Sequence, residues 1–175
     1  MRVVAPLAVL LAAIAAPAAG QTPAQISVIY FDLGNTLVKR VPDATRPTVW
    51  IEGTQEALAQ LQASGVRLGI LSNTGNFSWE QVRDEVLPED FDPTIFQEDL
   101  IVVSSAVGAQ KPDPEIFAYA IERAGLPPGG ILFVTESVDH VIAAQASGMR
   151  ALWVTEGQLP QLVAELVERN VVGVD

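Results

Sequence analysis

Residues 26–38 read ISVIYFDLGNTLV, and this stretch decides the fold that the rest of the sequence implies. Its first six residues are largely apolar and rich in β-branched and aromatic side chains, a pattern typical of a buried strand. Asp32 comes directly after that strand, and Gly34 follows in the turn. A carboxylate placed there can attack an electrophile while free backbone N–H groups face the same space. The stretch therefore predicts a strand that carries a nucleophile at its carboxyl end.

Downstream of this stretch, short apolar runs alternate with amphipathic segments, and one loose stretch at residues 39–48 carries two prolines. Strands separated by helices imply an α/β fold, a three-layer α/β/α sandwich with a Rossmann-like, mainly parallel sheet. Ligands of such folds bind at the carboxyl ends of the strands, where the strand order reverses. The expected strands are residues 26–31, 67–71, 100–103, 131–134 and 151–154, and the expected helices are residues 53–64, 78–86, 114–123, 139–146 and 160–169.

Three further polar residues fall at the ends of predicted strands or in the loops just beyond them: Ser72, Lys111 and Glu136. The hydroxyl could bind an anionic oxygen, the ammonium could neutralise a phosphate and orient Asp32, and the second carboxylate could complete a Mg²⁺ site. Taken singly, each has a structural explanation as a helix cap, a solvated lysine or an acid that complements a helix dipole. Their convergence on one edge of the sheet favours the functional interpretation.

The composition limits the partners. The chain has 175 residues, 49% of them hydrophobic, and a formal net charge of −11. Such a surface repels nucleic acid and anionic lipid, so we expect no nucleic acid partner and, once an N-terminal signal peptide (residues 1–20, below) is removed, no membrane partner. The expected partner is a small-molecule or exposed phosphorylated substrate. An anionic substrate then needs a local cluster of positive groups or a bound cation. The chain lacks cysteine, which excludes disulfides and thiolate chemistry.

Residues 1–20 have the layout of a secretory signal peptide. Arg2 gives a positive start, residues 3–16 are almost wholly apolar, and small residues follow. We expect cleavage after Ala18 or Gly20, export to the periplasm or medium, and a single hydrolase domain over residues 21–175. An uncleaved membrane anchor and a misassigned start codon are the alternatives.

These residues together resemble the haloacid dehalogenase (HAD) superfamily over residues 26–154. Residues 31–38, FDLGNTLV, look like its first motif, whose leading Asp is the family nucleophile, and residues 69–74, GILSNT, resemble the second. Residues 107–117, VGAQKPDPEIF, resemble the third motif and are the most specific match. Residues 134–149, VTESVDHVIAAQASGM, resemble the fourth.

The resemblance implies roles for individual residues. In the phosphatases of this family a phosphoaspartyl intermediate forms with the help of Mg²⁺. Carried over, Asp32, Lys111 and Ser72 are the catalytic residues, with the lysine and the serine holding the phosphoryl oxygens. Asp32, the Gly34 carbonyl and Glu136 are the expected Mg²⁺ ligands. The expected substrate-binding residues are Asn73, Thr36 and Asn35.

The chain departs from the phosphatase pattern in its first and fourth motifs. Gly34 stands where the phosphatases carry a second Asp, which protonates the leaving group and later activates water. Glu136 replaces the usual motif-four Asp, and the next acidic position is His140, with Asp139 one residue earlier. This histidine is the only one in the chain, and its place on an apolar helix predicts a structural role.

The spacing between motifs leaves no room for a full cap domain. Asp32 and Ser72 are 72 − 32 = 40 residues apart, and Ser72 and Lys111 are 111 − 72 = 39 apart. An uncapped site is open, so it admits bulky substrates or relies on a partner subunit for closure. The tryptophans Trp50, Trp79 and Trp153 leave room for a homo-oligomer interface.

Three functions are therefore open. The first is a Mg²⁺-dependent phosphatase that acts on phosphate monoesters through Asp32. The second is a binding protein that kept the fold and lost turnover, which Gly34 and the altered fourth motif favour. The third is a metal-independent hydrolase that resembles a haloacid dehalogenase. Those enzymes also lack the second Asp, but they use a cap to supply a halide-binding arginine and an apolar pocket, so the absence of a cap disfavours this function.

Overall fold

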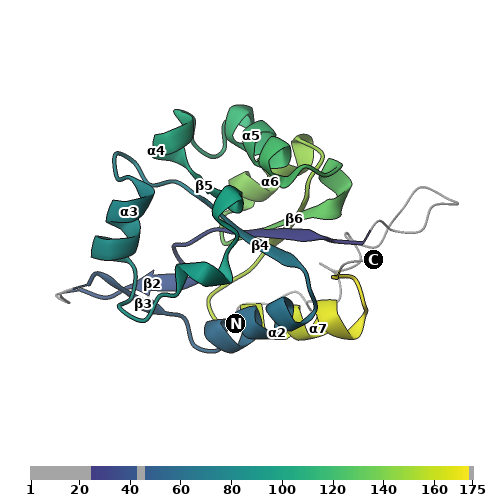
Figure 1. Cartoon of the computed structure of the whole chain (residues 1–175), viewed down its shortest axis with the longest axis horizontal. Helices are drawn as coiled ribbons and strands as arrows, with labels where there is room; N and C mark the ends of the chain where they lie inside the picture. The colour runs from purple at the N-terminus through teal and green to yellow at the C-terminus, as the bar shows by residue number, and fades with distance from the viewer. Residues whose placement is uncertain (1–24, 43–45, 174–175) are drawn as a thin grey trace, which may run out of the picture.

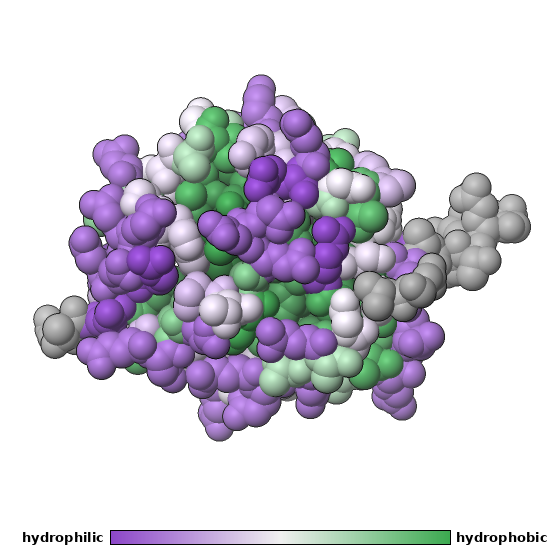
Figure 2. Space-filling model, in the orientation of Figure 1, coloured by the Kyte–Doolittle hydropathy of each residue, from purple (hydrophilic) through white to green (hydrophobic). Residues whose placement is uncertain are grey.

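The computed structural model describes residues 25–42 and 46–173. The predicted signal peptide, residues 1–20, lies outside the described residues. Among the helices that are described, none combines the length and the apolar character that crossing a bilayer demands. Hydrophilic residues cover much of the face shown in Figure 2, with hydrophobic residues visible between them.

A five-stranded parallel sheet forms the centre of the molecule, in the order β5-β4-β1-β6-β7. The chain starts at the central strand, builds outward through β4 and β5, and then returns to the other side of β1 for β6 and β7. This reversal beside β1 creates the switch point at which ligands of such sheets bind. The five strands are β1 (Val28–Phe31), β4 (Arg67–Ser72), β5 (Ile101–Val103), β6 (Ile131–Thr135) and β7 (Arg150–Trp153).

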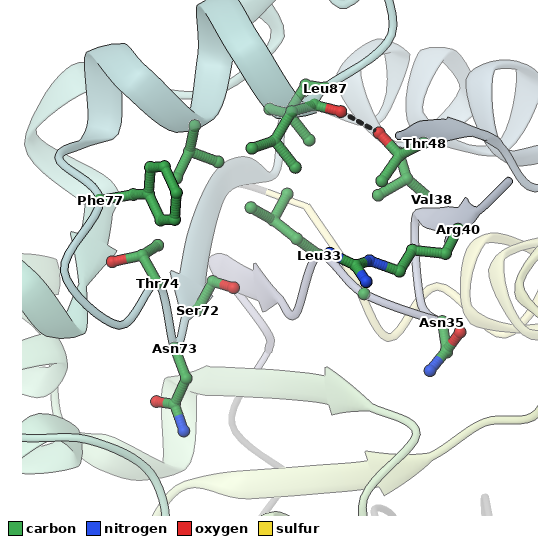
Figure 3. Close-up of a pocket in the computed structure, with 13 residues that line it drawn as sticks. Leu33, Asn35, Val38, Arg40, Thr48, Ser72, Asn73, Thr74, Phe77 and Leu87 are labelled. Carbon is green, nitrogen blue, oxygen red and sulfur yellow. Dashed lines mark hydrogen bonds between the residues drawn. The ribbon is translucent and has the colours of Figure 1, made fainter. Parts of the chain in front are cut away.

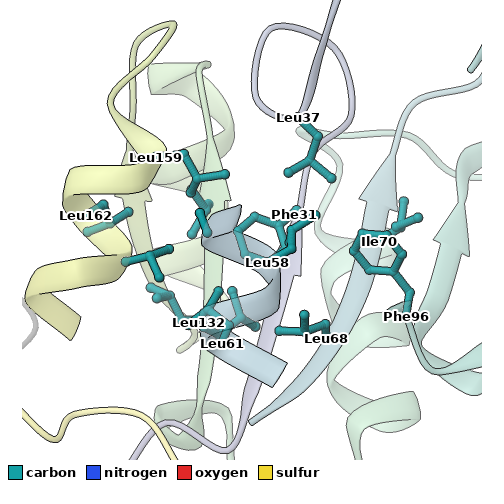
Figure 4. Packing of buried hydrophobic residues seen from close by; sticks show 14 of the residues in the cluster. Phe31, Leu37, Leu58, Leu61, Leu68, Ile70, Phe96, Leu132, Leu159 and Leu162 are labelled. Atoms are coloured by element: carbon teal, nitrogen blue, oxygen red, sulfur yellow. The ribbon is translucent and has the colours of Figure 1, made fainter. Parts of the chain in front are cut away.

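Helices cover both faces of the sheet, as the sequence predicts (Figure 1). One face carries α2 (Thr54–Ala63) and α7 (Leu159–Glu168), and the other carries α4 (Ser104–Val107), α5 (Pro114–Ala124) and α6 (Val138–Ala146). Two apolar cores result because β1 is buried on both sides. Phe31 packs with Leu58 and Leu162 in the first core (Figure 4), and Tyr30 packs with Phe117 in the second.

Gly69 allows the second strand to pack closely against its surroundings. A Cβ at this position would lie 2.7 Å from the Leu100 carbonyl oxygen and 2.8 Å from Tyr30 Cδ1. Side chains do not fit at such distances without a shift of the neighbouring backbone. The glycine therefore sets how closely β4 approaches the turn before β5, and with it the position of Ser72 at the end of β4.

The two ends of the stretch expected to be loose, residues 39–48, pair in a β-hairpin, whereas residues 41, 42, 46 and 47 lie in no helix or strand and residues 43–45 lie outside the described residues. Strands β2 (Val38–Arg40) and β3 (Thr48–Trp50) pair antiparallel, with Val38 opposite Trp50. Each strand has only three residues, which is too short for an alternating pattern to be visible in the sequence. Contacts with distant segments stabilise the hairpin instead.

The segment between β4 and β5 wraps around that hairpin. Ser78 and Gln81 form the predicted capping box at the start of α3 (Trp79–Gln81), which continues as a π-helical turn over Val82–Val86. The remaining short elements are 3₁₀ turns at Pro93–Ile95, Glu98–Leu100 and Pro128–Gly130. The described residues between β1 and β5 thus hold the hairpin, α2 and short turns, and no full cap domain.

Candidate active site

Asp32 is the centre of a polar cluster at the carboxyl end of β1, and only 6% of its surface is exposed. Its Oδ1 accepts hydrogen bonds from the backbone N–H of Leu33 at 2.9 Å and from the Ser72 hydroxyl at 3.3 Å. Its Oδ2 lies 2.5 Å from Lys111 Nζ and accepts a hydrogen bond from the Thr135 hydroxyl at 3.2 Å. The predicted catalytic residues therefore meet around one carboxylate.

The Lys111 ammonium is turned into the protein. Its Nζ donates to the Leu71 carbonyl oxygen at 2.7 Å and lies 5.1 Å from the centroid of the Phe133 ring. Asn73 fixes the lysine's backbone, because its side-chain amide donates to the Lys111 carbonyl and accepts from the Lys111 N–H, both at 2.8 Å. Asn73, which was expected to bind substrate, thus positions Lys111 with both polar atoms of its side chain and also lines the adjacent cavity.

The charge on Asp32 depends on Lys111. Burial alone would raise the pKa of the Asp32 carboxyl, since a carboxylate loses solvation inside a protein. The Lys111 ammonium and the hydrogen bonds to the carboxylate outweigh burial and lower the pKa of Asp32 to about 2. Burial lowers the pKa of Lys111, and the charge of Asp32 opposes that change. Asp32 is thus ionised at neutral pH.

Glu136 is held close to Asp32 by threonine hydroxyls. Its Oε2 accepts hydrogen bonds from Thr36 at 3.1 Å and from Thr135 at 3.3 Å, and Thr135 also contacts Asp32. Its backbone carbonyl accepts a hydrogen bond from Trp153 Nε1 at 2.7 Å. Thr36, expected to bind substrate, is buried and orients this carboxylate. Sequence reasoning missed Thr135, although its place at the end of β6 is a signal that could have revealed it.

The donors at this edge fit a magnesium ion that also contacts substrate. Proteins often hold Mg²⁺ through one or two carboxylates, with substrate phosphate oxygens and waters completing the octahedron. Asp32 and Glu136 supply two carboxylates that share one hydroxyl donor. Within residues 25–42 and 46–173, no three His, Cys, Asp or Glu side chains gather around a common point. The protein side chains would therefore fill only part of the coordination sphere of a bound Mg²⁺ and leave the other positions to water and substrate.

His140 lies beside Asp32, a position that the sequence alone did not reveal. Its Nδ1 lies 3.5 Å from Asp32 Oδ2, and 18% of its side chain is exposed. The helix that carries it begins with Ser137 as N-cap, whose hydroxyl accepts the backbone N–H of His140 at 3.4 Å. This cap fixes the first turn of α6 so that His140 points at the site, whereas neighbouring Asp139 is exposed.

A cavity of about 510 Å³ opens beside Ser72 and the turn after Asp32 (Figure 3). Gly34 and Asn35 line it, and Asn35 adopts a left-handed backbone conformation with φ of 53°. The space around Gly34 is open, since a Cβ there would meet no heavy atom within 4 Å. The cavity therefore adjoins the turn that follows Asp32 and the end of β4.

A sequence model of the haloacid dehalogenase-like hydrolases matches residues 34–154, more than half of the chain. The chain belongs to this family.

Curated HAD relatives include both dehalogenases and phosphatases. The chain is 32% identical over 117 residues to an (S)-2-haloacid dehalogenase of Pseudomonas putida, a match that covers 66% of this chain and 48% of the relative. It is 29% identical over 105 residues to phosphoglycolate phosphatase 1 of Pseudomonas aeruginosa, which covers 60% of this chain and 36% of the relative. The chain thus spans about half the length, or less, of these relatives.

Solved structures share the HAD fold. A HAD-family enzyme from Bacteroides thetaiotaomicron, solved with magnesium and inorganic phosphate, aligns with a TM-score of 0.62 at 18% identity. The alignment covers 75% of this chain and 96% of that one. An uncharacterized protein from Corynebacterium glutamicum aligns with a TM-score of 0.59 at 21% identity over 86% of this chain and 98% of the other. The α/β architecture predicted from the sequence is therefore confirmed.

Proposed function

We propose that this HAD hydrolase cleaves a phosphate monoester through an aspartyl phosphate formed on Asp32. The observation that carries the proposal is the meeting of three groups: an ionised, buried carboxylate, the Lys111 ammonium at 2.5 Å and the Ser72 hydroxyl at 3.3 Å. An ammonium and a hydroxyl beside a nucleophile are donors placed where the charge of a transferred phosphoryl group develops. Phosphatases among the relatives support the same chemistry.

The reaction takes two displacements at phosphorus. An oxygen of Asp32 attacks the phosphorus, the bond to the ester oxygen breaks, and the leaving group departs with the electron pair of that bond. Water then attacks the phosphorus of the aspartyl phosphate, the bond to the Asp32 oxygen breaks, and phosphate and free carboxylate result. Lys111 and Ser72 hold the phosphoryl oxygens in both steps, and the Asn73 contacts keep Lys111 in place.

Asp32, the Gly34 carbonyl and Glu136 are the residues that would hold Mg²⁺. When bound, the ion supplies positive charge to the phosphoryl oxygens. The hydroxyls of Thr36 and Thr135 orient Glu136 toward the same space, so the chain provides both ligands and their supports. The use of Mg²⁺ is supported by the structural neighbour from Bacteroides, which was solved with magnesium and inorganic phosphate.

Gly34 restricts the reaction to leaving groups that are stable anions. The position has no side chain that could donate a proton to the departing oxygen. Loss of a general acid costs on the order of 10²–10⁴-fold in rate when the leaving group is a poor one, and little when it is a stable anion. We therefore propose aryl rather than simple alkyl phosphates as substrates.

Hydrolysis of p-nitrophenyl phosphate by the purified protein tests the proposal. We expect turnover that requires Mg²⁺ and is lost in Asp32→Asn, with unchanged circular dichroism as a control for folding. Absence of turnover on any phosphate ester, together with absence of Mg²⁺ binding by calorimetry, would leave a binding protein with a HAD fold.

Dehalogenation is the second function that a specific observation favours. The sequence disfavoured it because a cap that could supply an apolar pocket and an arginine is missing. The cavity beside Ser72 nevertheless has apolar walls and includes Arg40, and a dehalogenase is among the relatives. Release of chloride from 2-chloropropionate in the presence of EDTA would support this function and contradict the phosphatase proposal if phosphate esters are not cleaved.

Export and assembly stay predictions. Residues 1–20 predict secretion. Mass spectrometry of the protein recovered from a bacterial host would test this prediction by showing whether the N-terminal segment is removed. A homo-oligomer is tested by light scattering.

A further inference from the structure

We infer that the cavity beside Asp32 selects aryl phosphates that carry a second anionic group, and that Arg40 recognises this group. The inference rests on the proposed function, because it names the substrate class of the same site. Three properties of the cavity carry it: its apolar walls, its one cationic side chain and the contacts that hold it open.

The walls of the cavity are apolar on two sides. Leu33 and Val38 line it from the turn after β1 and from β2, while Val82, Val86 and Leu87 line it from the π-helical segment. Phe77 lies opposite Leu33 in Figure 3, and 46% of its surface is exposed. Mostly buried aliphatic walls and one exposed aromatic side chain around a cavity of this size suit a flat apolar group such as an aryl ring.

Arg40 is the cationic side chain of the cavity lining. In Figure 3 it extends from β2 toward Leu33, at the side of the cavity across from Phe77. The neighbouring Lys39 is instead engaged in an ion pair, because its Nζ lies 2.6 Å from Glu156 Oε1. The ion pairs found within residues 25–42 and 46–173 do not include Arg40. An exposed guanidinium that lines a cavity with apolar walls is suited to a carboxylate or phosphate, which it binds through paired hydrogen bonds.

The phosphoryl group already has its own cation. Lys111 is buried against Asp32 and reaches the nucleophile directly. Arg40 comes from the hairpin and lines the cavity together with Gly34 and Ser72. Two cations on separate elements therefore face the reacting end and the far part of a bound molecule, which suits a substrate with two anionic ends.

The cavity is held in shape by contacts between the hairpin and the segment after α3. The Thr48 hydroxyl donates to the Val86 carbonyl, drawn as a dashed line in Figure 3. Arg46 Nη1 donates to the Arg83 carbonyl at 3.1 Å and to the Leu87 carbonyl at 2.8 Å. These hydrogen bonds hold the walls of the cavity in place before a ligand binds. Less conformational entropy is then lost on binding, and we expect the cavity to bind its ligand without a large change in the backbone.

Binding of non-hydrolysable phosphonates, measured by calorimetry with Mg²⁺ present, tests the inference without requiring turnover. We expect phenylphosphonate to bind about tenfold more tightly than methylphosphonate, and 4-carboxyphenylphosphonate about tenfold more tightly than phenylphosphonate. Arg40→Gln should reduce the preference for the carboxylate about fivefold or more. Lys39→Gln removes the adjacent positive charge outside the cavity lining and should leave this preference intact. Phe77→Ala should reduce the preference for phenyl over methyl.

Several results would overturn the inference. Equal losses in Arg40→Gln and Lys39→Gln would mean that only long-range charge matters. Equal weakening of both aryl ligands in Arg40→Gln would place the guanidinium on the phosphoryl group. Equal binding of the methyl and phenyl compounds by the unaltered protein would exclude the aryl site.

Hydrolysis of 4-carboxyphenyl phosphate separates the two proposals. Carboxylate-selective binding without hydrolysis would contradict the proposed catalysis and leave the recognition by Arg40 standing. Hydrolysis of aryl phosphates without carboxylate-selective binding would contradict the recognition by Arg40 and leave the proposed catalysis standing.

Discussion

Lys111 Nζ lies 2.5 Å from Asp32 Oδ2, and the side chain of the lysine has no surface exposed to solvent. This pair keeps the pKa of Asp32 near 2, although burial acts to raise it. Because the folded-state pKa of Asp32 lies below the value of 3.8 for a free carboxyl, ionisation of Asp32 contributes stability that is present above about pH 4 and is lost as the pH falls through about 2. The proposed nucleophile, Asp32, is therefore ionised across the working range of most enzymes.

Replacing Lys111 by methionine should change the pH profile as well as the rate. Without the ammonium, burial dominates and the pKa of Asp32 rises, so the acidic limb of kcat/KM for p-nitrophenyl phosphate should move to higher pH. The rate at the optimum should fall about 100-fold or more, since a donor to the phosphoryl oxygens is lost. Lys39→Met is the matched control and should leave the limb in place. An unchanged acidic limb in a folded Lys111→Met variant would contradict this role.

Introducing an acid at position 34 should accelerate the hydrolysis of poor substrates. Gly34→Asp is accommodated, because a Cβ there meets no heavy atom within 4 Å and the backbone is not left-handed. The rate on alkyl phosphates should rise by about 10²–10⁴-fold, with a smaller gain on p-nitrophenyl phosphate. Gly34→Asn has a similar shape but no titratable proton, and it should give no such gain. If a folded Gly34→Asp enzyme gains nothing, the missing acid does not limit the rate.

Glu136 should determine the affinity for Mg²⁺. Glu136→Gln removes one of the two carboxylates at the site, and the affinity measured by calorimetry should fall about tenfold or more. Thr36→Val removes a hydroxyl that contacts Glu136 at 3.1 Å and should give a smaller loss. Glu156→Gln, at the surface pair with Lys39, should have no effect on binding. Equal Mg²⁺ affinity in the Glu136→Gln and unaltered proteins would remove Glu136 from the proposed ligands.

Gly69 should be intolerant of even one added methyl group. An alanine there would place Cβ 2.7 Å from the Leu100 carbonyl oxygen, which forces a shift of packed backbone. We expect Gly69→Ala to lower the free energy of unfolding in urea by about 1–3 kcal/mol. Gly34→Ala adds the same group in open space and should change stability by no more than about 0.5 kcal/mol. Similar stabilities for the two variants would contradict the close approach of β4 to Leu100.

The strands of the sheet and the longer helices that cover it could be predicted from the sequence, because the patterns that indicate them lie within each segment. Apolar runs, a capping serine and terminal glycines predicted the strands of the sheet and the longer helices, whereas the short helix α4 (Ser104–Val107) was not predicted. The β2–β3 hairpin could not be predicted in this way. It is fixed by the contacts of Thr48 with Val86 and of Arg46 with Leu87, which join segments far apart in the chain.

The site shows the same division between local and long-range causes. The strand-end rule located Asp32 and Ser72, because parallel strands end at one edge. The inward direction of Lys111 depends on its contacts with Asn73 and Leu71, which only the folded chain brings together. The position of His140 against Asp32 follows from the orientation of α6, which no local pattern reveals.

Trapping the covalent bond to Asp32 tests the central claim most directly. The protein is mixed with p-nitrophenyl phosphate and Mg²⁺, quenched in acid, reduced with borohydride and digested for mass spectrometry. We predict that the peptide containing Asp32 carries homoserine at that position, because borohydride reduces an acyl phosphate, and that Asp32→Asn yields none. Sustained hydrolysis of the ester with an unmodified Asp32, or with the label on another residue, would contradict the account.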